Sequence, residues 1–209
     1  LFVGSQGTLG TISEITLETA AYNPQTTLLA AQFETIEDMQ AAVMDIKSKG
    51  DSPSALEMVD KHLLEMVESI NPNQLKGIID APFPAVVLLI EFDDSSDRAQ
   101  HKNVKRVKKI LEHYTSKVQE ETDPMQQEKL WKIRHASATL ISHSAGTKKA
   151  LPIIEDGVVP LDKFKEYLAG VYDIFARHRL DVAVWGHAGD ANLHMQPYLD
   201  LAQVGDRQQ

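Results

Sequence analysis

Apolar residues recur along this chain with two different periods, and the way the periods alternate predicts its architecture. Short, nearly continuous apolar runs are typical of buried strands, whereas apolar residues spaced three or four positions apart are typical of helices. On these patterns we expect strands at 26–33, 54–59 and 85–92 and an extended segment at 151–159. We expect helices at 36–49, at 60–69, from Ser95 or Ser96 to Leu111, from Pro124 to about Ser144 and from Pro160 onward. A pair of short extended runs, at 182–185 and 193–198, closes the sequence. Strands and helices therefore alternate through most of the sequence.

This order of elements predicts an α+β fold in which helices pack on one face of an antiparallel sheet. Two ferredoxin-like halves that meet near residue 95 would account for the repeated strand-helix-strand units. The Tyr22-Asn23-Pro24 step interrupts the pattern, so we expect the main domain to cover residues 23–209 and residues 1–22 to belong to another unit. Within that first unit, Ile12, Ile15 and Leu17 begin a β-rich segment.

Composition and charge narrow the class of protein. The 209 residues carry a formal net charge of −9 and only residues 102–109 are locally basic, which argues against nucleic-acid binding because phosphate neutralisation needs a basic face. There is no cysteine for disulfides or thiolate metal sites, and no apolar run approaches the roughly 18 residues that cross a bilayer. The chain opens on Leu1 without a signal peptide, so we expect a cytoplasmic piece of a longer protein, whose parent is either free or peripheral to the membrane.

Chemistry is concentrated near the end of the sequence, in Gly186-His187-Ala188-Gly189-Asp190-Ala191-Asn192-Leu193-His194. If the flanking apolar runs pair as a hairpin, His187 and His194 flank its turn and direct two imidazoles at one point. Imidazole is the commonest ligand of transition metals, and such a pair needs a third partner. Asp190 is better suited to stabilising the turn or orienting a histidine. A polar turn that simply faces solvent is the alternative interpretation.

Three other groups are candidates for binding. Arg134 lies on a predicted helix, where a guanidinium can bind a small organic acid through two parallel hydrogen bonds or can simply cover apolar neighbours with its stem. The glycine-rich loop at residues 4–10 exposes backbone N–H groups to an anion, or is a tight turn before a strand. Glu155 and Asp156 end an extended run and either approach a metal or are solvated there.

Three stretches together resemble one family, the FAD-linked oxidases and dehydrogenases of D-2-hydroxy acids, such as D-lactate dehydrogenase, the glycolate oxidase flavin subunit and D-2-hydroxyglutarate dehydrogenase. Residues 4–12, Gly-Ser-Gln-Gly-Thr-Leu-Gly-Thr-Ile, are similar to the last flavin-contacting loop of the family's FAD-binding domain. Residues 154–160, Ile-Glu-Asp-Gly-Val-Val-Pro, are similar to a strand-to-helix passage of its C-terminal domain. Residues 186–194 resemble its most specific signature.

The resemblance implies that residues 1–22 are the tail of an FAD-binding domain and that residues 23–209 are a duplicated ferredoxin-like substrate or cap domain without its C-terminal portion. The implied FAD contacts are Gly4, Ser5, Gly7, Thr8, Gly10 and Ile12. His187 and His194 would hold a divalent metal, often zinc, while Arg134 would meet the substrate carboxylate and Gln196 would lie near the substrate. In such an enzyme a small 2-hydroxy acid loses its C2 hydride to flavin and its hydroxyl proton to a base. We expect an electron acceptor and a homo-oligomer as partners.

The sequence also departs from the family pattern. Ala191 replaces a glycine of the histidine signature, and Ile154 occupies a position where hydroxyglutarate-type members have lysine, which disfavours that substrate. The Glu-His-Gly motif that supplies the third metal ligand and a catalytic histidine does not occur before Gln209, so we expect the isolated chain to be stable but inactive.

Two other functions compete with this interpretation. One is a ferredoxin-like ligand-binding or regulatory module without chemistry, in which the histidine turn is structural. The other is a two-histidine hydrolase, for which the sequence offers no nucleophile-activating constellation.

Overall fold

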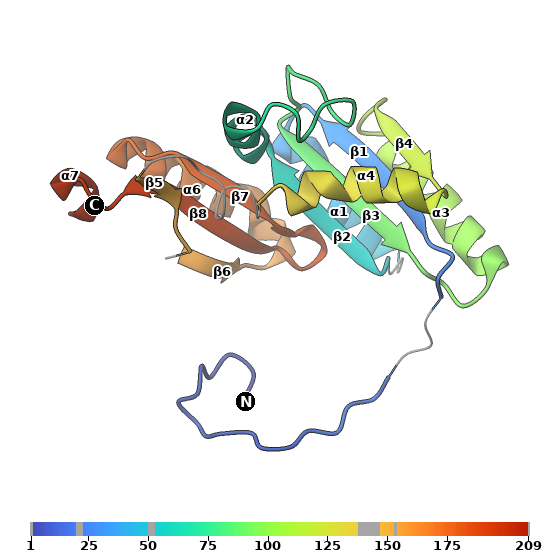
Figure 1. Cartoon of the computed structure of the whole chain (residues 1–209). Coiled ribbons are helices and arrows are strands. Elements are labelled where there is room, and N and C mark those ends of the chain that lie inside the picture. Colours follow the sequence, from blue (N-terminus) through green and yellow to red (C-terminus); the bar gives the residue numbers. More distant parts are fainter. Residues whose placement is uncertain (1, 20–22, 50–52, 138–146, 153, 209) are drawn as a thin grey trace.

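The structure, a computed structural model, describes residues 2–19, 23–49, 53–137, 147–152 and 154–208 (Figure 1). Its strands are β1 (Thr27–Phe33), β2 (Ala55–Asp60), β3 (Val86–Phe92), β4 (Val118–Glu121), β5 (Lys148–Ala150), β6 (Ile154–Val158), β7 (Val182–His187) and β8 (Asn192–Asp200). Its helices are α1 (Ile36–Ser48), α2 (Lys61–Ile70), α3 (Asp97–Leu111), α4 (Pro124–His135), α6 (Phe164–His178) and α7 (Val204–Arg207), with 3₁₀ turns η1 (Leu161–Lys163) and η2 (Ala188–Asp190). In these ranges all strand pairs are antiparallel, in the order β4-β1-β3-β2-β7-β8-β5, with β6 also paired to β8.

The sheet is built from one ferredoxin-like unit and part of a second. In the first half, β1, α1, β2, β3, α3 and β4 give the strand order β4-β1-β3-β2. In the second half, β6, α6, β7 and β8 repeat the first part of that arrangement with the order β6-β8-β7. The halves join where β2 pairs with β7. The predicted α+β fold with duplicated ferredoxin-like halves is therefore confirmed.

The predicted boundary between the halves near residue 95 is wrong. The first half continues through α3 to β4, whose residues 118–121 pair with β1. This strand reads Val-Gln-Glu-Glu and is largely exposed or only half-buried, so it lacks the alternating apolar residues that reveal a strand in the sequence.

Helices cover both faces of the sheet. The predicted helical layer on one face consists of α1, α3 and α6, which enclose a core containing Phe33, Met58, Leu88 and Val184. The opposite face is also covered, by α2 and α4, over a second core that contains Trp185. Strand β3 explains this second layer, because five successive apolar residues bury side chains on both sides.

The helices begin where polar capping residues precede an apolar stripe. The Thr35, Asp60, Ser96 and Asp123 side chains each accept a hydrogen bond from a backbone N–H of the first turn of α1, α2, α3 and α4. Each such cap typically contributes about 1 kcal/mol. The fourth helix was predicted to run to about Ser144. Helix α4 ends at His135, and Ser137 is again helical after a turn at Ala136. The rest of this prediction falls on residues 138–146, which lie outside the described residues.

The N-terminal segment extends away from the sheet (Figure 1). Residues 11–19 form no strand, so the predicted β-rich segment is not observed. Ile12, Ile15 and Leu17 are 62%, 65% and 70% exposed, and no described strand pairs with them. A single extended segment needs neighbouring strands to be stable, which explains the difference. Among the helices of the described ranges, none has the length and apolar character needed to span a membrane.

Candidate functional site

The predicted hairpin is present and is formed by β7 and β8 with η2 at its turn. Gly186 has φ +149°, and a methyl group there would lie 2.5 Å from the Asn192 carbonyl oxygen, so the close approach of the two strands requires glycine. Ala191, which stands where the family pattern has glycine, adopts the left-handed conformation with φ 48° and is fully buried. The turn thus retains a left-handed backbone conformation at this position, although the residue is alanine and not glycine.

His187 and His194 lie side by side on the hairpin, as predicted. In the strand register His187 is opposite Asn192 and Trp185 is opposite His194, so the two histidines are diagonal neighbours on one face. Their ring centroids are 5.4 Å apart and their planes are inclined by 78°. The Trp185 ring lies 6.0 Å from that of His194 and forms the apolar side of the site. Two imidazoles therefore converge on one region of the sheet surface.

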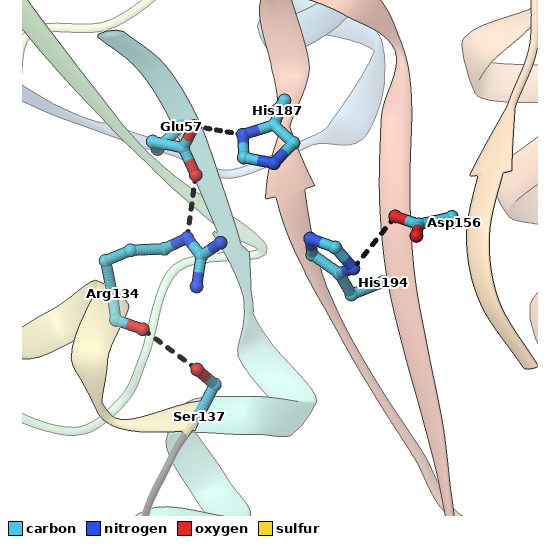
Figure 2. A network of polar contacts seen from close by, with 6 residues as sticks. All are labelled: Glu57, Arg134, Ser137, Asp156, His187 and His194. Atoms are coloured by element: carbon cyan, nitrogen blue, oxygen red, sulfur yellow. Dashed lines mark hydrogen bonds and ion pairs between the residues drawn. The ribbon is translucent and has the colours of Figure 1, made fainter. Parts of the chain in front are cut away.

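Glu57 joins this region to Arg134 (Figure 2). Strand β2 places Glu57 directly opposite His187, and its Oε1 lies 2.5 Å from His187 Nδ1. The other carboxylate oxygen accepts a hydrogen bond of 2.7 Å from Arg134 Nε on α4. The two side chains of this ion pair are 13% and 17% exposed, so water screens the pair only weakly. The structure therefore brings Arg134, His187 and His194 together through a residue that the sequence interpretation missed.

Only one signal in the sequence could have identified Glu57. It is a charged residue within an otherwise apolar strand, Ala-Leu-Glu-Met-Val, and such a residue commonly has a partner. The partner could not be predicted, because the pairing of β2 with β7 joins the two halves of the sheet.

Asp156 lies against the second histidine. Its Oδ1 is 3.4 Å from His194 Nδ1, and its backbone has φ 57° at an irregularity between β6 and β8. Glu155 and Asp156 were expected either to approach a metal or to be solvated. The Asp156 carboxylate is 69% exposed and lies beside the imidazole of His194. Both histidines consequently direct Nδ1 at a carboxylate, so Nε2 is the ring nitrogen that each could offer to a bound molecule.

The described side chains supply too few ligands for a complete metal site. A catalytic divalent ion usually has three protein ligands, and no group of three suitable side chains occurs among the described residues. Asp190 does not complete the set, because its carboxylate is 78% exposed and lies 3.7 Å from Lys47 Nζ. His187 and His194 thus remain a pair of candidate ligands without a third among the described residues.

The other residues that the sequence analysis singled out lie in different parts of the structure. Gln196 is 2% exposed and lies two positions after His194, on the same face of β8. The loop at residues 4–12 does not join the site and stands apart from the sheet (Figure 1). Ile154 pairs with Met195 and lines an apolar hollow beside α6, on the face opposite the histidines.

A hollow of about 490 Å³ opens beside the site. It is lined by polar and apolar residues that include Lys47, Leu56, Glu57, His187 and Asp190. Its position lets a small molecule reach the edge of the His187 ring.

Comparison with known proteins now assigns the family. A sequence profile described as FAD linked oxidases, C-terminal domain, matches residues 23–209. The chain belongs to this family. It is similar to the glycolate oxidase subunit GlcD of Bacillus subtilis (29% identical, 93% of this chain and 39% of the relative), to that of Escherichia coli K12 (28%, 99% and 40%) and to D-lactate dehydrogenase of Archaeoglobus fulgidus (26%, 94% and 41%).

The chain spans about two fifths of the length of these relatives. Solved structures of FAD-linked oxidase fold resemble it as well. An alkyldihydroxyacetonephosphate synthase has a TM-score of 0.65 at 16% identity, covering 96% of this chain and 40% of the other. p-Cresol methylhydroxylase has a TM-score of 0.59 at 11% identity, covering 90% and 40%. These likenesses concern the fold.

Proposed function

We propose that this FAD-linked oxidase domain forms the substrate side of a flavin-dependent enzyme that oxidises a D-2-hydroxy acid, of the lactate or glycolate kind, to the 2-oxo acid. The observation that carries the proposal is the Arg134–Glu57–His187 line beside His194. The two polar groups of a 2-hydroxy acid are its carboxylate and the neighbouring hydroxyl group. The Arg134 guanidinium suits the carboxylate, and the two imidazoles suit the hydroxyl group. The names of the curated relatives support the same substrate class.

Arg134 binds the substrate carboxylate in this proposal. Glu57 engages Nε, which fixes the plane of the guanidinium and leaves the edge formed by the two Nη atoms for a ligand. Figure 2 shows this end of the side chain directed toward the strand pair that carries the histidines. The buried amide of Gln196 on the same face supplies a further polar group for the acid.

The histidines bind the hydroxyl end of the substrate. A carboxylate that accepts the Nδ1 proton of His187 fixes the tautomer in which Nε2 carries a lone pair. That nitrogen accepts the hydroxyl proton in a hydrogen bond or binds a divalent ion. Among the described residues, no third side chain joins the two imidazoles, so a divalent ion at this position would need further ligands.

FAD supplies the acceptor for the C2 hydride when it is bound. Within this chain the loop containing Gly4, Ser5, Gly7, Thr8, Gly10 and Ile12 suits such a ligand. Gly4 and Gly7 have positive φ and open space where a side chain would be, so a cofactor can approach the backbone closely. A separate electron acceptor then reoxidises the flavin.

Arg134→Met in the full-length protein tests the assignment. With D-lactate or glycolate and an artificial electron acceptor, we expect kcat/KM to fall by about 100-fold, because a charge-assisted bidentate contact of roughly 3 kcal/mol is lost. The exposed Arg98→Met on α3 is the matched control and should keep full activity. Unchanged kcat/KM in Arg134→Met would refute this role. Unchanged activity in His187→Ala and His194→Ala would favour a non-catalytic ligand-binding or regulatory module.

A further inference from the structure

Helix α3 presents two very different faces. Its apolar residues are buried against α1, β1 and β3, namely Val104, Val107, Ile110 and Leu111. From Arg98 to Leu111 the helix contains six lysine and arginine residues and no acidic residue. The remainder of the chain holds the other 15 of the 21 basic residues and all 30 acidic residues. Helix α3 is therefore a positive segment of an otherwise acidic protein.

Four of these cations form one line along the exposed side of the helix. They follow one another at steps of three or four residues, which places them on the same helical face, and all four are exposed: Arg98, Lys102, Lys105 and Lys109. We call these four residues the basic stripe. The exposed His101 lies beside it. The helix thus gathers its positive charge on one side.

Neighbouring carboxylates leave the basic stripe charged. Among the described residues, none forms an ion pair with any of its four members, whereas Lys108 on the flank of the helix pairs with Glu120 at 2.8 Å. Asp97 and Glu112 lie at the two ends of the helix. The charge of the stripe is therefore directed at solvent or at a partner.

The basic stripe lies away from the candidate functional site. Helix α3 belongs to the layer that covers the core around Met58 and Leu88. The Arg134–Glu57 pair and Trp185 lie on the opposite face of the sheet, which α2 and α4 cover. In Figure 1, α3 is at one end of the sheet and the β7–β8 hairpin is toward the other. A partner bound to the stripe consequently leaves the site open.

The composition of the exposed side indicates which partner it fits. The centre of a protein–protein interface is apolar or aromatic and is depleted in lysine, but every exposed residue of α3 is polar and three of the four stripe residues are lysine. A protein bound tightly to duplex DNA neutralises about 6–10 phosphates, more than the stripe can reach. A row of four or more cations on an amphipathic helix suits the flat surface of an anionic membrane.

We infer that the basic stripe of α3 adsorbs to the surface of an anionic lipid membrane. The contact is electrostatic and does not insert into the bilayer, because the apolar residues of α3 are buried in the domain core. Each cation contributes separately, so the adsorption is weak, reversible and sensitive to salt. This inference does not depend on the proposed function.

Co-sedimentation of the full-length protein with lipid vesicles tests the inference. We expect binding to vesicles that contain about one third phosphatidylglycerol, no binding to pure phosphatidylcholine, and release at about 0.5 M salt. Substitution of all three stripe lysines, Lys102→Gln, Lys105→Gln and Lys109→Gln, should weaken binding by about 100-fold, since each exposed lysine accounts for roughly a fivefold change. The single variant Lys105→Gln should weaken it by roughly fivefold.

A second triple variant is the matched control. Lys61→Gln, Lys163→Gln and Lys165→Gln remove the same charge from exposed positions on other elements, where each lysine pairs with a glutamate, and should leave vesicle binding unchanged. Equal binding by the two triple variants would overturn the inference, as would equal binding to both kinds of vesicle or none to the anionic kind. Binding to a DNA duplex without binding to vesicles would also overturn it, in favour of a nucleic-acid partner.

Discussion

The Glu57 carboxylate contacts a guanidinium with one oxygen and an imidazole with the other, so one side chain sets the positions of Arg134 and His187. We expect Glu57→Gln in the full-length protein to lower kcat/KM by about 10–100-fold, the usual effect of removing a group that orients a ligand residue. Steady-state kinetics with D-lactate measure it. Glu65→Gln removes an exposed carboxylate that pairs with Lys61 and should have no effect. Equal kinetics for the two variants would show that Glu57 only stabilises the fold.

His62 makes the stability of the domain depend on pH. The hydrogen bond between His62 Nδ1 and the buried Asp60 carboxylate, 3.1 Å long, raises the pKa of the imidazole above its usual value. A raised folded-state pKa means that the charged form stabilises the fold. This contribution is fully present below the unfolded-state pKa of about 6.5 and is lost as pH rises through the folded-state pKa.

The difference in thermal midpoint between the wild type and His62→Gln should therefore be largest near about pH 6 and shrink by about pH 9. Differential scanning calorimetry at a series of pH values measures it, with the exposed His101→Gln as control. A difference that grows with pH would contradict the assignment.

At the residue scale, the sequence predicted which side chains lie near one another but not the residue that connects them. Arg134, His187 and His194 were identified from residue type and from the resemblance, and the structure brings them together. Glu57 was missed because its two partners are remote in sequence and meet it only through the β2–β7 pairing and the packing of α4.

At the scale of elements, the β7–β8 hairpin depends on Gly186. A side chain at this position would meet the backbone of Asn192 and Leu193 at 2.5 and 3.0 Å, where the strand cannot yield easily. We expect Gly186→Ala to destabilise the domain by about 3 kcal/mol, from the positive φ and the overpacking together. Denaturant unfolding measures the loss. Gly205→Ala in α7 has open space around it and should change stability by no more than about 1 kcal/mol. Equal stability of the two variants would show that the hairpin adapts.

The elements that the sequence predicted are those with a strong local signal. Strand β3 is a continuous apolar run, and α1, α2 and α3 combine an apolar stripe with an N-terminal cap. Strand β4 has neither, since it forms at the polar edge of the sheet through its pairing with β1. Local patterns therefore found the core elements but not the edge that closes the first half.

At the scale of the whole molecule, the candidate site lies at the junction of the two halves. Glu57 comes from β2 of the first half and His187 from β7 of the second, and the two strands pair there. Arg134 comes from α4, which connects the halves in the chain and packs on β2. The polar groups of the candidate site thus lie along the junction between β2 and β7. Local sequence patterns could not predict this junction, because it depends on which edge strands of the two halves pair with each other.

In the function proposed above, the full-length protein transfers a hydride from a D-2-hydroxy acid to flavin. Anaerobic mixing of the purified protein with D-lactate or glycolate, followed by its absorbance spectrum, tests it most directly. We predict that the oxidised-flavin absorbance bleaches with D-lactate or glycolate, that L-lactate leaves it unchanged, and that bleaching slows markedly in Arg134→Met. A protein without flavin absorbance, or a flavin that neither of these substrates reduces, would refute this function.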